Sequence, residues 1–99
     1  MIPPDREKIA ATLKARRREL RERYGVVGIA LFGSCLRGES RPGSDIDLLV
    51  DFAETPGFFK FLELEEELAS WLGARVDLVT RKALKPHIGE RILKEMMPL

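Results

Sequence analysis

The sequence predicts an α/β protein, with a three-stranded mixed sheet flanked by about four helices, in a single domain that spans residues 1–99. Three short apolar runs have the length and composition of buried strands. Two longer stretches repeat apolar residues at helical spacing, and one of them joins the second strand to the third. The expected strands are 26–32, 45–52 and 75–80, and the two long helices are 5–24 and 58–72.

Composition and charge limit the function classes that fit this chain. It is 44% hydrophobic and 33% charged, as soluble globular proteins are. Its net charge of only +1 gives no overall attraction to nucleic acid or to an anionic membrane. No apolar run approaches the ~20 residues that a membrane span needs, and the N-terminus has no signal-peptide pattern. The lone cysteine, Cys35, excludes an internal disulfide and fits a reducing compartment, so we expect a cytoplasmic protein.

The first long helix is expected to begin after Asp5, a good N-cap, and to end at Gly25. Its apolar face consists of Ile9, Leu13, Leu20 and Tyr24. The other face is rich in arginine, and two interpretations of it remain open. It is either a solvated face whose arginines pair with Glu19 and Glu22, or a contact surface for an acidic partner or substrate.

The first expected strand, 26–32, runs into Gly33-Ser34, and only one or two helical turns fit before the break at 41–43. A strand that turns into a helix presents free backbone N–H groups, which makes the junction a candidate anion site. Gly33 would let the backbone approach a phosphate closely. Ser34 would either donate its hydroxyl or simply cap the short helix.

The second expected strand, 45–52, carries two carboxylates. Because side chains alternate along a strand, Asp45 and Asp47 share one face, with Cα atoms roughly 6–7 Å apart. Such a pair can bind a hard divalent ion such as Mg²⁺ together with substrate phosphates. A phosphate-binding turn beside this carboxylate pair is the combination of groups that phosphoryl or nucleotidyl transfer needs. The alternative is that the two carboxylates form ion pairs with Arg37 or Arg75.

The order of the elements predicts the topology of the sheet. The turn and the carboxylate pair meet only if the first two strands are antiparallel. The long helix that follows crosses over to a third strand, which favours parallel pairing. This places Asp77 at the edge that carries the other two carboxylates. A carboxylate on a mostly apolar strand needs a partner, which would be a metal ion, an attacking hydroxyl, or Arg75 or Arg81.

The long helix 58–72, which Gly73 ends, has an apolar stripe too broad for a three-stranded sheet to cover. The stripe either packs against the first helix or forms a groove for a partner. A last amphipathic helix is expected from Pro86 to about Met96.

The spacing of these motifs resembles a known family. Gly33-Ser34, ten residues and then Asp45-x-Asp47 is similar to the signature of the minimal nucleotidyltransferases, a branch of the DNA polymerase β-like superfamily. The agreement extends to Arg37-Gly38, to 44–50, to 76–79 and to the tail 83–93. It therefore covers nearly the whole chain. The resemblance implies the nucleotidyltransferase fold and the metal-dependent transfer of AMP from ATP to a hydroxyl.

The resemblance also implies roles for the candidate residues. Asp45 and Asp47 would hold two ions of Mg²⁺ or Mn²⁺. Asp77 would complete the second metal site or help to deprotonate the attacking hydroxyl. The Gly33 backbone and the Ser34 hydroxyl would bind the β and γ phosphates of ATP. Two roles remain open for Arg37. Its side chain would either reach the triphosphate or stabilise the carboxylates. The chain departs from the family at Cys35-Leu36, where a basic and a small residue are expected, so nucleotide affinity is expected to be lower.

Small members of this family resemble the antitoxin halves of HEPN/MNT toxin–antitoxin pairs. The resemblance therefore implies a HEPN ribonuclease toxin as partner, with a tyrosine of the toxin as the acceptor of AMP. One alternative is a non-catalytic, nucleotide-binding antitoxin that acts by steric inhibition. Another is a nucleotidyltransferase acting on RNA, against which the balanced charge and the single exposed-aromatic candidate, Phe59, argue. We expect no membrane partner and allow for homo- or hetero-oligomers.

Overall fold

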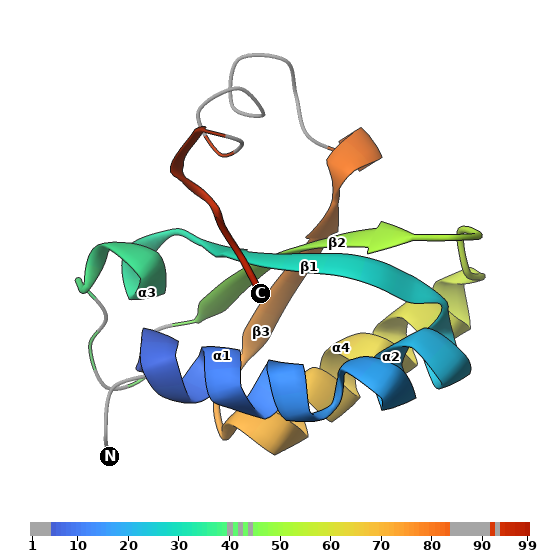
Figure 1. Cartoon of the computed structure of the whole chain (residues 1–99), viewed down its shortest axis with the longest axis horizontal. Helices are drawn as coiled ribbons and strands as arrows, with labels where there is room; N and C mark the ends of the chain where they lie inside the picture. The colour runs from blue at the N-terminus through green and yellow to red at the C-terminus, as the bar shows by residue number, and fades with distance from the viewer. Residues whose placement is uncertain (1–4, 40, 42, 44, 84–91, 93) are drawn as a thin grey trace.

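The computed structural model describes residues 5–39, 41, 43, 45–83, 92 and 94–99. Four helices, four strands and a short 3₁₀ helix lie within these residues, and Figure 1 shows their arrangement. In chain order they are α1 (Arg6–Ala15), α2 (Arg17–Tyr24), β1 (Val26–Phe32), α3 (Ser34–Arg37), β2 (Ile46–Phe52), α4 (Phe58–Leu72), β3 (Val76–Thr80), the 3₁₀ helix η1 (Arg81–Ala83) and β4 (Met97–Pro98).

The strands form one mixed sheet in the order β3-β2-β1-β4. β1 and β2 are antiparallel, with Phe32 opposite Asp47, and β2 and β3 are parallel, with Asp47 opposite Asp77. The predicted directions of these three strands are therefore confirmed. As a result, the end of β1 and the beginnings of β2 and β3 meet at one end of the sheet.

The prediction of a three-stranded sheet is wrong, because a fourth strand covers the outer edge of β1. Met97 and Pro98 pair antiparallel with Leu31 and Ala30. The Leu99 N–H donates to the Ile29 carbonyl at 2.9 Å. An uncovered β1 would expose a row of backbone N–H and C=O groups along this edge. A two-residue strand that includes a proline has no alternating pattern by which the sequence could reveal it.

The prediction of one continuous first helix is also wrong, because the helix is interrupted at Arg16. Arg16 has φ −110° and ψ 13°, and its N–H bonds to the Leu13 carbonyl at 3.2 Å, three residues back. Its guanidinium lies 4.4 Å from the centre of the Trp71 ring and 3.3 Å from the Glu19 carboxylate. Through the contact with Trp71, the Arg16 side chain joins the break between α1 and α2 to α4. Gly25 ends α2 in the left-handed conformation, as predicted.

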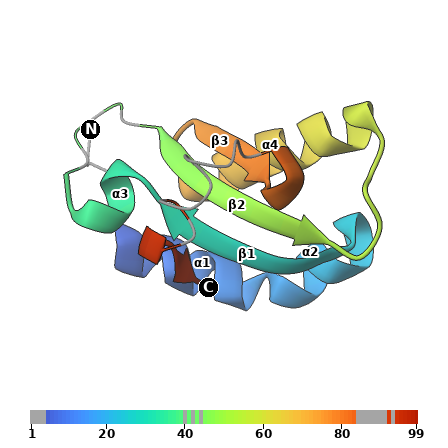
Figure 2. The ribbon, with the colours of Figure 1, turned by 90° about the horizontal axis from the view of Figure 1, so that it is seen from above.

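The core lies between one face of the sheet and a layer formed by α1, α2 and α4 (Figures 1 and 2). Leu64 and Leu68 of α4 are buried in it, and Trp71 is partly buried against it. The middle and end of the apolar stripe of α4 therefore pack into the core that the first helices share, while the alternative of a partner groove stays open for its exposed beginning. Phe58, Phe59 and Leu62 of α4 remain exposed.

The predicted C-terminal helix lies mostly outside the described residues. Of the part that is described, the Met96 N–H donates to the Ile92 carbonyl at 2.8 Å, which closes one helical turn. In the described part of the chain, no helix is long and apolar enough to cross a membrane.

Candidate functional site

The turn after β1 is built on Gly33. This residue has φ +79° and ψ −156°, and it forms the N-terminal boundary of α3. The Arg37 N–H bonds to the Gly33 carbonyl at 3.2 Å, which closes the single turn of α3. Ser34 is the first residue inside the helix, so the alternative in which Ser34 is the helix cap is wrong. Because α3 has only four residues, the turn offers backbone N–H groups rather than a strong helix dipole.

Gly33 is in direct contact with Asp47 of the neighbouring strand. A Cβ atom on residue 33 would overlap Oδ2 of Asp47 and lie 3.0 Å from its Cγ. The missing side chain therefore makes room for the Asp47 carboxylate beside the turn. The predicted anion-binding turn and one of the predicted carboxylates thus form one continuous surface.

The three predicted carboxylates lie at this same end of the sheet. Asp47 and Asp77 are register partners on the parallel strands β2 and β3. Asp45 immediately precedes β2 and is exposed. Its Oδ1 lies 3.2 Å from Nε of Arg75, which is the ion pair that the sequence offered as an alternative.

Asp77 forms no ion pair with any described residue. Arg75 binds Asp45, and Arg81 binds Asp51, with Nε and Nη2 of the guanidinium 3.2 and 3.1 Å from the two carboxylate oxygens. Both arginines that were considered as partners of Asp77 are therefore engaged elsewhere. The Asp77 side chain is exposed and free to meet a group from solution.

The carboxyl group of Asp47 has a perturbed pKa. Burial raises its pKa above the usual range of an aspartate, and the negative charges of Asp77 and Asp45 raise it further. The positive charge of Arg37 acts in the opposite direction. A half-buried carboxylate beside two others is stabilised in its charged form by a cation.

The donor set suits a hard divalent cation, because all three side chains are carboxylates. The described residues nevertheless contain no group of three His, Cys, Asp or Glu side chains already arranged to hold a metal ion. One of the three carboxylates, Asp45, is paired with Arg75. The residue types present nevertheless fit a hard cation.

Arg37 lies at the end of α3 and is half exposed. Its Nε is 3.1 Å from a carboxylate oxygen of Glu39, and its Nη1 is 4.0 Å from Glu95. It forms no hydrogen bond to Asp45 or Asp47 in the described part of the chain. Arg37 acts on the carboxylates electrostatically, because its positive charge opposes the rise in the pKa of Asp47.

Several positioning residues were not found from the sequence. The Cys35 side chain is buried and its Sγ lies 3.7 Å from the Asp45 carbonyl, which ties α3 to the start of β2. Arg6 donates to the Leu36 carbonyl at 3.1 Å and so fixes α3 to α1. Asp51, which is bound by Arg81, lies farther along β2 and outside the carboxylate cluster. The alternation of side chains along 45–52 could have revealed Asp51, whereas the other two contacts depend on how the elements pack.

Comparisons with known proteins show which sequences and folds this chain is similar to. Residues 13–98 match the family described as the nucleotidyltransferase domain. The chain is 50% identical over 91 residues to the protein adenylyltransferase MntA of Thermococcus cleftensis, which covers 92% of each chain.

Three solved structures are also similar. A proposed minimal nucleotidyltransferase matches with a TM-score of 0.73 and 38% identity, over 95% of this chain and 91% of that one. A toxin–antitoxin with AMP-PNP matches with a TM-score of 0.71 and 29% identity, over 93% and 69% of the two chains. A complex of a tri-AMPylated Shewanella oneidensis HEPN toxin with an MNT antitoxin matches with a TM-score of 0.66 and 25% identity, over 91% and 70%.

Proposed function

The chain belongs to the nucleotidyltransferase domain family, and we propose that it transfers AMP from ATP to a tyrosine hydroxyl of a HEPN ribonuclease toxin. In this role it is an antitoxin that acts by adenylylation. The similarity to the adenylyltransferase MntA supports the reaction type, and the similarity to a complex containing a tri-AMPylated HEPN toxin supports the acceptor class.

One structural observation carries the proposal. Asp47 lies against the Gly33 turn and directly opposite Asp77, so a candidate phosphate-binding backbone and two acidic groups share one end of the sheet. A nucleotide whose β and γ phosphates bind at the turn would have its α phosphate close to these carboxylates. That is the arrangement which nucleotidyl transfer requires.

The residues at this end of the sheet have complementary roles in the proposal. The Gly33 backbone and the Ser34 hydroxyl bind the β and γ phosphates, and Arg37 supplies positive charge near the triphosphate. Asp45 and Asp47 would hold Mg²⁺ or Mn²⁺, and Asp77 would either complete the second metal site or accept a proton from the acceptor hydroxyl. Such an ion, when bound, neutralises phosphate charge and acidifies a nearby hydroxyl.

The transfer itself breaks one bond and forms one. The acceptor oxygen bonds to the α phosphorus of ATP, the bond between that phosphorus and the α–β bridging oxygen breaks, and pyrophosphate leaves. The proton of the acceptor hydroxyl passes to a base. Asp77 is suited to accept it, because its carboxylate is exposed and has no ion-pair partner among the described residues.

The alternative is an antitoxin that binds nucleotide and inhibits the toxin sterically. The salt bridge between Asp45 and Arg75 favours it, because that contact occupies a carboxylate which the catalytic proposal needs. The two candidates make different predictions for variants that lose the carboxylates and keep the fold.

The deciding experiment is transfer of AMP to the purified HEPN toxin in the presence of ATP and Mg²⁺, followed by intact-mass measurement. We expect a mass increase equal to one or more AMP groups on a tyrosine. Asp45→Asn and Asp47→Asn should each abolish it. Asp51→Asn is the matched control, because Asp51 lies on the same face of the same strand but outside the cluster, and it should retain transfer.

Toxicity in cells separates the two candidates. If the enzyme activity protects the cell, Asp47→Asn should bind the toxin and fail to protect. Full protection by a stably folded Asp45→Asn/Asp47→Asn double variant would contradict the catalytic proposal and establish steric inhibition.

A further inference from the structure

Arg75 is in direct contact with the carboxylate cluster, which consists of Asp45, Asp47 and Asp77. The Nε atom of Arg75 lies 3.2 Å from Oδ1 of Asp45, and Arg75 forms no other ion pair with a described residue. The Arg75 side chain is 85% exposed and that of Asp45 is 48% exposed. An exposed arginine–aspartate pair contributes little to stability, so this contact can be broken without disturbing the fold.

The sheet itself fixes the two residues beside each other. Asp45 immediately precedes β2 and Arg75 immediately precedes β3, and the first residues of these strands, Ile46 and Val76, are register partners. The Ile46 N–H donates to the Arg75 carbonyl at 2.8 Å. Arg75 is therefore brought to Asp45 by the same parallel ladder that aligns the other two carboxylates.

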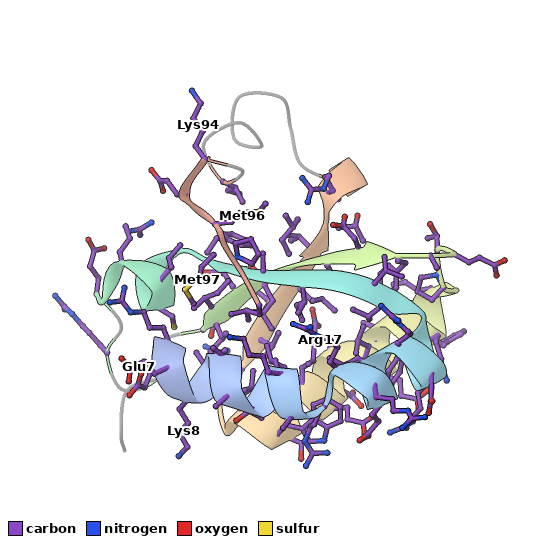
Figure 3. All side chains as sticks on the ribbon, viewed as in Figure 1. Glu7, Lys8, Arg17, Lys94, Met96 and Met97 are labelled. Atoms are coloured by element: carbon purple, nitrogen blue, oxygen red, sulfur yellow. The ribbon has the colours of Figure 1, made fainter. Side chains whose placement is uncertain are left out.

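Several other basic side chains lie elsewhere. Figure 3 shows Lys8 and Lys94 pointing away from the sheet. The Arg81 guanidinium binds Asp51, farther along the same two strands. Arg37 pairs with glutamates and forms no salt bridge to the cluster within the described part of the chain. Arg75 differs from these four cations in its direct contact with the cluster.

The charges of the cluster and of Arg75 do not balance. Three ionised carboxylates outweigh one guanidinium by two charges, which is the charge of one Mg²⁺ or Mn²⁺ ion. Carboxylate oxygens are preferred ligands of such ions, so a divalent ion at the cluster competes with Arg75 for Asp45. An arginine released in this way is free to bind another anion. The phosphates of ATP are the anions that the proposed function brings to this end of the sheet, and a guanidinium suits them well.

We propose that Arg75 exchanges partners when the site is loaded: it binds Asp45 in the absence of nucleotide, and it binds a phosphate group once a divalent ion has replaced it at Asp45. This inference rests on the proposed function, since it concerns the same site. A divalent ion without nucleotide meets a competitor at Asp45. A divalent ion with nucleotide also offers Arg75 a new partner, so metal and nucleotide strengthen each other's binding.

The test measures two affinities of the full chain by calorimetry at about 0.15 M salt. One is the affinity for Mn²⁺ alone, and the other is the affinity for AMP-PNP in excess Mn²⁺. Arg75→Gln should tighten the binding of Mn²⁺ alone by about threefold or more, because it removes the competitor. The same variant should weaken the binding of AMP-PNP by about fivefold or more, because it removes a phosphate ligand.

Arg81→Gln is the matched control. It removes the same charge from an arginine that also pairs with an aspartate of β2, six residues and roughly 20 Å farther along the ladder. That distance exceeds the Debye length, so both affinities should change by no more than about twofold. Both variants should keep the wild-type circular dichroism and melt close to the wild-type temperature, since each loses only an exposed ion pair.

The direction of the two changes decides the inference. A weakening of both affinities in Arg75→Gln would indicate a purely structural role and would overturn the exchange. So would an unchanged affinity for Mn²⁺ alone, an unchanged affinity for AMP-PNP, or equal effects of Arg75→Gln and Arg81→Gln.

These measurements also separate the inference from the proposed function, because neither uses transfer of AMP. Opposite changes of the two affinities in Arg75→Gln, together with a wild-type chain that transfers no AMP to the toxin, would refute the proposed activity and support the exchange. Transfer of AMP with both affinities unaltered in Arg75→Gln would refute the exchange alone. A wild-type chain that binds neither Mn²⁺ nor AMP-PNP would refute both.

Discussion

At the scale of single residues, Asp47 connects the turn to the carboxylates. Its side chain occupies the space that Gly33 leaves, and it faces Asp77 across the β2–β3 ladder. Burial and the negative charge of Asp77 both disfavour the charged form of Asp47, so its pKa is raised. The chain therefore keeps a carboxylate where the fold alone would be more stable with a neutral group. That is typical of a residue retained for binding or catalysis.

This leads to a prediction about pH. A carboxyl group with a raised pKa in the folded state contributes stability that is fully present below its unfolded pKa, roughly 4, and is lost as the pH rises through the folded value. Asp47→Asn cannot ionise, so it should be more stable than the wild type at pH 7 without ligand, by a few tenths of a kcal/mol or roughly 2 °C in Tm. The difference should disappear as the pH falls to about 4.

Thermal unfolding from pH 3.5 to 8 measures this difference. Asp51→Asn serves as the control, because Asp51 is bound by Arg81 and its replacement removes an ion pair without relieving any repulsion. It should not stabilise the protein at pH 7. An Asp47→Asn variant with the wild-type Tm across the whole pH range would show that the carboxylates do not repel each other in the folded protein.

At the scale of secondary-structure elements, a polar contact joins α2 to α4 at the edge of the core. The buried Tyr24 donates its hydroxyl hydrogen bond to the Glu67 carboxylate, and Arg23 also donates to it. The hydrogen bond from Tyr24 is the main reason that the pKa of Glu67 is lowered. Burial and the same carboxylate raise the pKa of Tyr24. The contact therefore fixes how the two helices lie beside one another.

Tyr24→Phe should remove this contact while keeping the packing of the ring. Because the Glu67 carboxylate would lose a donor next to the core, we expect a loss of about 1–2 kcal/mol in the free energy of unfolding. The lowered pKa of Glu67 means that the contact stabilises the protein above an unfolded pKa of roughly 4 and that this stability is lost as the pH falls. The loss in Tyr24→Phe should therefore be larger at pH 7 than at pH 3.5.

Urea unfolding at the two pH values tests this expectation. Arg18→Ala is the control, since Arg18 forms only an exposed pair with Glu22 on α2. It should change the free energy of unfolding by less than about 0.5 kcal/mol at either pH. Equal stability of Tyr24→Phe and the wild type at pH 7 would show that Tyr24 contributes only its apolar ring.

At the scale of the whole molecule, the proposed site depends on three elements that are distant in sequence. The turn before α3, the start of β2 and the start of β3 meet only in the folded sheet (Figure 2). A ligand that binds there binds the folded state and not the unfolded chain. Its binding energy therefore adds to the stability of the protein.

ATP with Mg²⁺ should raise the Tm, and at a concentration of about 100 times the Kd the gain should be about 2.7 kcal/mol, or roughly 10 °C or more. The Asp45→Asn/Asp47→Asn double variant should lose the part of the shift that depends on Mg²⁺. Chelation of Mg²⁺ should have the same effect on the wild type. An unchanged Mg²⁺-dependent shift in the double variant would place the metal elsewhere.

The sequence by itself determined the features that are encoded within a few neighbouring residues. The apolar and polar residues along 45–52 predicted a strand there, and β2 covers Ile46–Phe52, with Asp45 just before it. Glycines at 25 and 73 set the ends of α2 and α4, where both adopt positive φ. The requirement that the turn and the carboxylates meet gave the directions of β1, β2 and β3. Each of these inferences depends on local backbone preference and on short connections between elements.

Only the tertiary structure decided the features that depend on how distant segments pack. β4 exists because a two-residue segment at 97–98 meets the edge of β1, more than sixty residues earlier. The Arg16 side chain at the helix break contacts Trp71, fifty-five residues later, and the partner of Asp45 is Arg75 rather than a residue near it in the chain. A side chain's choice among several possible partners is set by distances in the folded chain. Those distances arise from the docking of whole elements, which no local pattern records.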